Sequence, residues 1–122
     1  TESKFSHCQI INYFELKKYL KKKNFKIVKL ANQSFAKQIY MFWNANCIIS
    51  AHGAALTNLV FCKQKTKVIE LKPFRHPGKN YQRISKVNNL LYYSIESQKK
   101  YLKNKNGDIF VDLKKLDKKI NL

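Results

Sequence analysis

Glycine, proline and acidic residues are scarce in this 122-residue sequence, which has 3 Gly, 2 Pro and 7 Asp or Glu. So little glycine and proline excludes collagen-like and most low-complexity structure, because both depend on these residues. The chain is 44% hydrophobic and 13% aromatic, which is too apolar for a disordered segment. Length and composition together predict one globular domain with a buried core.

The scarcity of acidic residues leaves a net charge of +18, because 25 Lys and Arg are present. All of these basic residues except Arg75 and Arg83 are lysines. Sequence-specific nucleic-acid readout relies on the bidentate guanidinium of arginine, so we expect no specific nucleic-acid partner and interpret most of the charge as a solvated surface. A second function class stays open: a basic module that binds nucleic acid or an anionic membrane surface without catalysis, through residues 17–26 and the lysine-rich carboxyl-terminal segment.

Close-spaced metal-ligand pairs are also missing. Cys8, Cys47 and Cys62 are far apart and form no CxxC motif, whereas zinc sites usually contain such pairs. We therefore predict reduced cysteines and no metal site, and expect a reducing, cytoplasmic location.

Charged side chains are absent from Gln38 to Cys62, a stretch long enough to raise the question of a membrane span. A spanning helix would place many polar groups in hydrocarbon, which is costly. These groups belong to Asn44, Asn46, Ser50, His52, Thr57 and Asn58. The stretch therefore predicts a protein core.

Helical and strand-like hydrophobic patterns alternate along the chain. Helices are predicted at about 9–23, at 35–43 with Ser34 as N-cap, at 54–61, at 81–90, and after the cap Asp112. Strands are predicted at 25–30, 47–50, 67–71 and 92–95, the second of them buried on both faces, with a proline-containing loop after 71 and a turn at 106–108. The alternation predicts an α/β fold, a Rossmann-like parallel sheet with helices on both faces.

Ligands of open parallel sheets bind beyond the carboxyl ends of the strands. The polar residues at the predicted strand ends are therefore the candidates for a site. They are Asn32, Gln33, Ser34, His52, Gly53, Glu70, Arg75, His76 and Glu96. Among them Arg75 is a candidate phosphate contact, whereas His76 is interpreted as an ordinary loop residue.

The most specific pattern is the segment Ser50–Asn58, in which a strand runs through a His-Gly turn into a helix. Gly53, Ala54 and Ala55 leave the backbone accessible, and the helix start favours an anion such as a diphosphate. Simple turn packing, with His52 hydrogen-bonded inside the loop, explains the residues equally well. For Glu70, the corresponding alternative is an ion pair with a lysine.

The run AHGAALTNLVF from Ala51 to Phe61, followed by KVIEL from Lys67 to Leu71, resembles the signature of glycosyltransferase family 61. This family includes bacterial capsular-polysaccharide transferases, plant xylosyl- and arabinosyltransferases, and the eukaryotic EGF-domain and O-mannose N-acetylglucosaminyltransferases. The resemblance extends outward, because Asn12, 25–30, Ser34 with Gln38, and 92–93 stand in the order expected for the family.

The resemblance implies the carboxyl-terminal, Rossmann-like half of a GT-B enzyme, usually inverting and independent of metals and cofactors. Such an enzyme transfers a sugar from a nucleotide sugar to a glycan or polysaccharide acceptor. Residues 1–122 would then form a single donor-binding domain, a fragment without the amino-terminal acceptor domain. A peripheral contact with an anionic membrane is a further expectation.

The resemblance also assigns roles to individual residues. His52 would be catalytic, stabilising charge on the departing diphosphate, and the turn would face that diphosphate through Gly53, Ala54 and Ala55. Thr57 and Asn58 would support the turn, and Glu70 would accept hydrogen bonds from ribose or sugar hydroxyls. One departure concerns an arginine that family members commonly carry shortly before the position of Asn12, where this chain has Lys4, Ser6 and His7.

Overall fold

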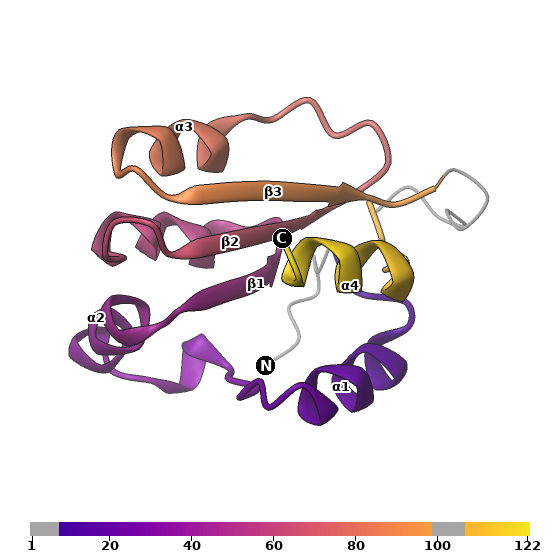
Figure 1. The fold of residues 1–122 in the computed structure, drawn as a ribbon, viewed down its shortest axis with the longest axis horizontal. Helices are drawn as coiled ribbons and strands as arrows, with labels where there is room; N and C mark the ends of the chain where they lie inside the picture. Colours follow the sequence, from indigo (N-terminus) through magenta and orange to yellow (C-terminus); the bar gives the residue numbers. More distant parts are fainter. Residues whose placement is uncertain (1–7, 99–106) are drawn as a thin grey trace.

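A computed structural model describes residues 8–98 and 107–122, and its centre is a parallel three-stranded sheet (Figure 1). The strands β1 (Cys47–Ala51), β2 (Lys67–Lys72) and β3 (Leu91–Glu96) follow the spatial order β1-β2-β3. The pairing places Ser50, Glu70 and Ser94 side by side across the sheet. This architecture confirms the predicted α/β class and is consistent with a Rossmann-like fold.

Helices precede, connect and follow these strands. They are α1 (Tyr13–Lys22), α2 (Phe35–Asn44), α3 (Asn80–Val87) and α4 (Leu113–Ile120), with the 3₁₀ helices η1 (Leu30–Asn32) and η2 (Ala54–Phe61). Both predicted N-caps are confirmed: Ser34 accepts the backbone N–H of Lys37, and Asp112 accepts those of Lys114 and Lys115.

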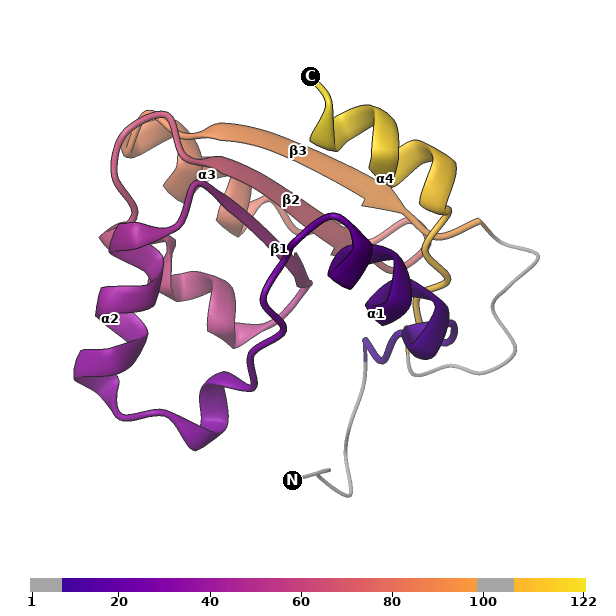
Figure 2. The ribbon, with the colours of Figure 1, turned by 60° about the horizontal axis from the view of Figure 1, so that its bottom comes forward.

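Two hydrophobic clusters cover the two faces of the sheet, and Figure 2 shows α1 and α4 on the opposite side from α2 and α3. Successive residues of β2 alternate between these faces. Ile69 and Leu71 point toward α1 and α4, which we call the α1/α4 face. Val68 and Glu70 point the other way, toward η2 and α3, which we call the η2/α3 face.

The predicted strand at 25–30 is wrong. Residues 25–29 form no strand with any described residue, and Leu30 begins η1. Phe25 and Ile27 pack against the α1/α4 cluster, while Leu30 packs against the η2/α3 cluster. The hydrophobic pattern therefore reports side-chain burial in a segment whose backbone does not join the sheet.

The predicted helix at 54–61 is confirmed in its bounds, and the burial predicted for the strand at 47–50 needs correction. The segment 54–61 is a 3₁₀ helix, with Leu56 N–H donating to the Gly53 carbonyl and the Thr57 hydroxyl donating to the Ala54 carbonyl. Strand β1 lies at an edge of the sheet, and its residues pack against both clusters but are only half-buried, so the strand is less buried than predicted. The predicted turn at 106–108 begins outside the described residues.

Asn12 joins segments from opposite ends of the chain. Its side-chain amide donates to the Val111 carbonyl at 2.8 Å and accepts the Val111 N–H at 2.9 Å. Ile10 and Ile109 form a parallel bridge nearby. This pairing occupies the residues before Tyr13, so α1 begins later than the sequence pattern predicts.

The uncharged stretch 38–62 folds into most of α2, then β1 and η2. Among the residues that the structure describes, no helix has the length and apolar character needed to cross a bilayer.

Candidate functional site

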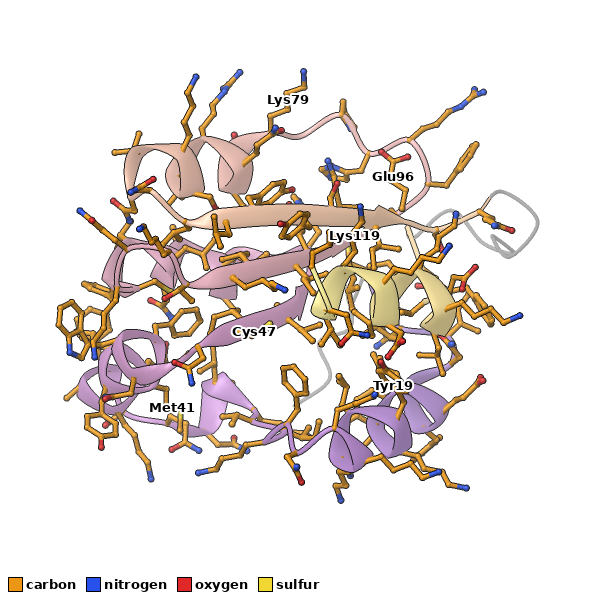
Figure 3. The ribbon with its side chains drawn as sticks, in the orientation of Figure 1. Tyr19, Met41, Cys47, Lys79, Glu96 and Lys119 are labelled. Atoms are coloured by element: carbon orange, nitrogen blue, oxygen red, sulfur yellow. The ribbon has the colours of Figure 1, made fainter. Side chains whose placement is uncertain are left out.

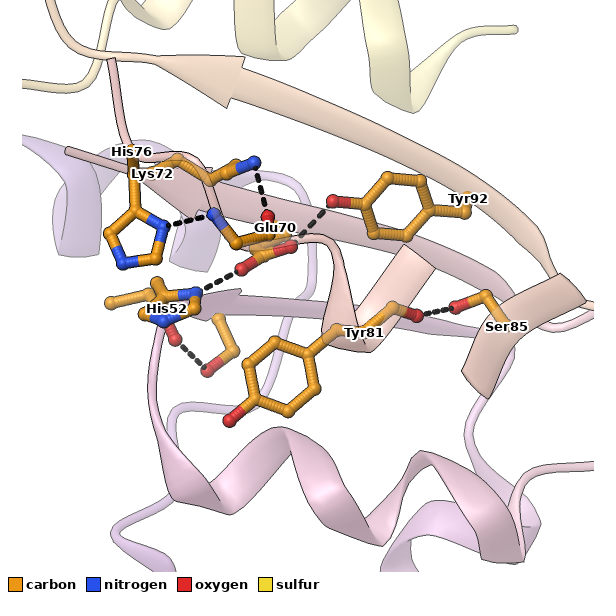
Figure 4. A network of polar contacts seen from close by, with 10 residues as sticks. His52, Glu70, Lys72, His76, Tyr81, Ser85 and Tyr92 are labelled. Carbon is orange, nitrogen blue, oxygen red and sulfur yellow. Dashed lines mark hydrogen bonds and ion pairs between the residues drawn. The ribbon is translucent and has the colours of Figure 1, made fainter. Parts of the chain in front are cut away.

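His52 lies where the chain leaves β1, at the carboxyl edge of the sheet. Its backbone N–H donates to the Leu71 carbonyl at 2.8 Å, and its Nδ1 lies 2.5 Å from Oε2 of Glu70 (Figure 4). A carboxylate accepts from the protonated nitrogen of an imidazole, so this contact places a proton on Nδ1. The side chains of His52 and Glu70 are 15% and 2% exposed.

Tyr92 is the second partner of Glu70. Its hydroxyl donates to Oε1 of the carboxylate at 2.5 Å, from the neighbouring strand β3. Burial raises the pKa of Tyr92, and the hydrogen bond and negative charge of Glu70 raise it further. Glu70 is thus a buried carboxylate with each oxygen hydrogen-bonded, which offsets the cost of removing it from water.

The other ring nitrogen of His52, Nε2, is the open end of this arrangement. Among the residues that the structure describes, no hydrogen bond of His52 involves Nε2. Within residues 8–98 and 107–122, every buried side-chain nitrogen or oxygen has a hydrogen-bond partner. Nε2 therefore reaches solvent, and Glu70 holds the imidazole with that atom available to a ligand.

A second imidazole, His76, stacks on the first. The ring centroids of His52 and His76 are 4.0 Å apart, with the planes tilted by 45°. Nδ1 of His76 accepts the Gly78 N–H at 3.0 Å, and Lys72 Nζ donates to the Gly78 carbonyl at 3.0 Å. Burial lowers the pKa of His76, and the charges of His52 and Lys72 lower it further.

Tyr81, in the first turn of α3, closes another side of His52, with 5.2 Å between the ring centroids. Burial raises the pKa of Tyr81, and the negative charge of Glu70 adds to this effect. Ser85 donates its hydroxyl to the Tyr81 carbonyl within the same helix. The imidazole of His52 is therefore surrounded by groups from β2, α3 and the loop between them (Figure 4).

The turn after His52 is open. Gly53 has extended backbone angles, φ 166° and ψ 171°, and an added Cβ would come no closer than 3.9 Å to the Ala51 carbonyl oxygen. Ala54 and Ala55 are exposed. Conformation and packing alone therefore do not require glycine at position 53, although close approach of a ligand would.

Thr57 and Asn58 lie in η2, beside the turn. Asn58 donates its side-chain amide to Oε1 of Gln38 at 2.9 Å, and Gln38 in turn donates to the carbonyls of Leu30 and Gln33. These bonds attach η2 to α2 and to the segment before it. Their supporting role toward a donor remains a prediction.

Arg75 and Glu96 are not brought into this group. Arg75 is exposed, has a left-handed φ of 54°, and places its guanidinium 5.0 Å from the Phe74 ring. Glu96 is exposed at the end of β3 (Figure 3). Glu70 lies within β2, and both of its oxygens contact protein side chains, so direct contact with sugar hydroxyls stays a prediction.

Sequence reasoning did not identify Tyr92, Tyr81 and Lys72 as site residues, and it dismissed His76. Tyr92 was detectable in principle, because Val68 and Glu70 share a face and Tyr92 pairs in register with Val68. The stacking of His76 depends on a loop path that no periodic pattern encodes. The described residues contain no group of three or more His, Cys, Asp or Glu side chains able to hold a metal ion.

A parallel α/β sheet with a histidine at its carboxyl edge and a buried carboxylate beside it is consistent with a domain of the Rossmann-like class. The family model of glycosyltransferase 61 matches residues 3–69, more than half of the chain, so the protein belongs to that family. Membership supports glycosyltransferase activity. A search of curated proteins gave no match. The matched region includes His52 and the open turn, and it ends one residue before Glu70.

Proposed function

We propose that this chain is the donor-binding domain of a glycosyltransferase that moves a sugar from a nucleotide sugar to a glycan or polysaccharide acceptor. The observation that supports this most strongly is the arrangement of His52, whose Nδ1 is held by buried Glu70 while Nε2 faces solvent beside an exposed turn. Family membership supplies the reaction class.

In the proposed reaction an acceptor hydroxyl oxygen attacks the anomeric carbon of the donor. The bond between that carbon and the diphosphate oxygen breaks, the configuration inverts, and negative charge develops on the departing diphosphate. The hydroxyl proton leaves to a base that we place in a separate acceptor-binding domain. In its doubly protonated form, with Nδ1–H bound to Glu70, His52 donates from Nε2 to a diphosphate oxygen and so stabilises the charge that develops.

The turn contributes to the same task. The first N–H groups of a helix lack intrahelical acceptors, and they carry partial positive charge. Those of Ala54 and Ala55 come directly after the His52-Gly53 turn and lie in exposed residues. Glu70 and Tyr92 act behind His52, since they fix the orientation of its ring rather than face the turn. The proposed binding needs no metal ion.

Calorimetry with UDP- and GDP-sugars, which carry a diphosphate, tests the proposal, and Gly53→Ala is the most informative variant. The added methyl has space in the protein, so the melting temperature should stay within the small range of a neutral surface change. The methyl would occupy the approach to the turn, so donor affinity should fall about tenfold. If no nucleotide sugar binds the wild-type chain, the proposal is wrong.

Salt dependence separates this function from the basic binding module. Binding of a polyanion through the +18 charge should weaken steeply as ionic strength rises, and its affinity should be unchanged in His52→Ala. Nucleotide-sugar binding should depend on His52 and respond less to salt. We also propose a cytoplasmic location with peripheral contact to anionic membranes, where the same charge would attract both lipid and donor.

A further inference from the structure

The stacked His52 and His76 rings suggest a role for the second imidazole that the proposed function leaves unused. We propose that His76 is a second donor-binding residue, whose Nε2–H binds the same diphosphate as His52. This inference rests on the proposed function and adds a residue from outside the His-Gly turn.

The hydrogen bond to Gly78 decides which nitrogen of His76 carries the proton. A backbone N–H can only donate, so Nδ1 of His76 accepts and has a free lone pair. The proton of the neutral ring is therefore on Nε2. Burial and the charges of His52 and Lys72 lower the pKa of His76, which favours this neutral form at physiological pH.

Both Nε2 atoms are available to one ligand. Neither forms a hydrogen bond in the described structure, where buried side-chain nitrogens all have partners, so both reach solvent. The ring centroids are 4.0 Å apart, and ring nitrogens lie close to their centroid, so the two Nε2 atoms are near one another. The oxygens of a single diphosphate can accept from both atoms. A neutral His76 also avoids repulsion with a protonated His52.

The loop holds His76 in this position before any ligand arrives. Lys72 is 7% exposed, and its Nζ binds the Gly78 carbonyl, while the Gly78 N–H binds His76. A Cβ at Gly78 would lie 2.7 Å from Cε1 of His76 and 3.7 Å from Cε1 of His52. Glycine at position 78 therefore allows the close stack, and the donor groups are preorganised, as electrostatic catalysis requires.

If His76 served only to hold the loop, its Nδ1 contact with Gly78 would matter and its Nε2 donor would not. Two substitutions separate this structural role from the proposed binding role. Asparagine places an acceptor near the position of Nδ1, so His76→Asn preserves the Gly78 contact and removes the distal donor. Glutamine reaches the position of Nε2, so His76→Gln restores a distal N–H and gives up the Gly78 contact.

The experiment measures inorganic pyrophosphate binding by calorimetry for the wild-type chain and both variants, with thermal unfolding as a check on folding. We expect the affinity of His76→Asn for pyrophosphate to fall by roughly tenfold or more, which is the effect of losing one hydrogen bond to a charged group. The affinity of His76→Gln should stay near that of the wild type. Loss only in His76→Gln, equal loss in both variants, or loss in neither would overturn the assignment.

Imidazole ¹⁵N chemical shifts provide a second measurement. The sequence has three histidines, so a His7→Gln background leaves His52 and His76 as the imidazole signals. We expect pyrophosphate to shift the Nε2 signals of both rings. A shift of His52 alone would refute the role of His76 and leave the proposed function standing. Absence of any pyrophosphate binding would reject the role of His76, whereas the proposed function is rejected only if nucleotide sugars also fail to bind.

Discussion

The two faces of the sheet differ in what they bury. On the α1/α4 face a buried hydrophobic cluster runs from Leu16 in α1 to Leu116 in α4, and β2 contributes Ile69 and Leu71 to it. On the η2/α3 face, the same strand β2 buries Glu70 beside Val68. A buried carboxylate with partners is weak evidence of a contribution to stability, because its desolvation offsets its hydrogen bonds. We therefore expect a core change on the first face to affect mainly stability, and a change at Glu70 to affect mainly the proposed binding.

The largest effect on stability is expected from Leu116→Ala, on the α1/α4 face. Leu116 is fully buried in α4, so truncation leaves a cavity and should cost about 2–5 kcal/mol of the free energy of unfolding. Urea denaturation measures this loss. The matched control Leu122→Ala, at a position 67% exposed, should change stability little. Similar losses for the two variants would contradict the cluster described for this face.

Glu70→Gln tests the other face. Glutamine can still accept from His52 and bond to Tyr92, but the negative charge is lost, so stability should stay similar or rise. Pyrophosphate affinity should fall roughly tenfold to a hundredfold, the value of one charge-assisted hydrogen bond that orients His52. Calorimetry and thermal unfolding measure the two quantities.

Glu96→Gln is the control for this change, because it removes the same charge from an exposed position at the end of β3. The pyrophosphate affinity of Glu96→Gln should match that of the wild type. Equal losses for Glu70→Gln and Glu96→Gln would mean that only net charge matters, and would remove the distinction between the two faces.

The smallest effect concerns Asp117 on α4, which accepts a hydrogen bond from the Tyr19 hydroxyl of α1. That bond lowers the pKa of Asp117, burial opposes the shift, and Lys23 at 3.5 Å adds to the lowering. A lowered folded-state pKa means a stabilising contribution that is complete above the ordinary value of 3.8 and is lost as pH falls through the folded pKa.

Asp117→Asn should therefore lower the melting temperature slightly at neutral pH. The melting temperature of this variant should then fall less steeply than that of the wild type as the pH is lowered. Thermal unfolding between pH 2 and 7 measures both effects. Tyr19→Phe removes the donor of the same hydrogen bond and should give a similar profile. An unchanged acid decline in both variants would show that the contact does not link α1 to α4.

The sequence predicted much of this fold because hydrophobic periodicity and capping are local. Ser34 and Asp112 cap helices as expected, and all three observed strands were predicted within one or two residues. The strand at 25–30 failed because its alternation reflects burial against two clusters. A strand also needs a paired edge, which no local pattern supplies.

The residues of the candidate site likewise fall into those that the sequence identified and those that only the structure revealed. His52, the open turn and Glu70 were identifiable from a continuous motif and a strand end. The family match covers the first two of these, whereas His76, Tyr81 and Tyr92 lie outside it. These three residues approach His52 or Glu70 only because β3, α3 and the connecting loop fold against β2.

By itself, the sequence determined the α/β class, the family and the His-Gly turn, since each depends on neighbouring residues or a contiguous motif. Only the tertiary structure decided that Glu70 is buried, that its oxygens bind His52 and Tyr92, and that His76 stacks on His52. The physical reason is register: parallel pairing and the path of one loop bring together side chains that are distant in the sequence.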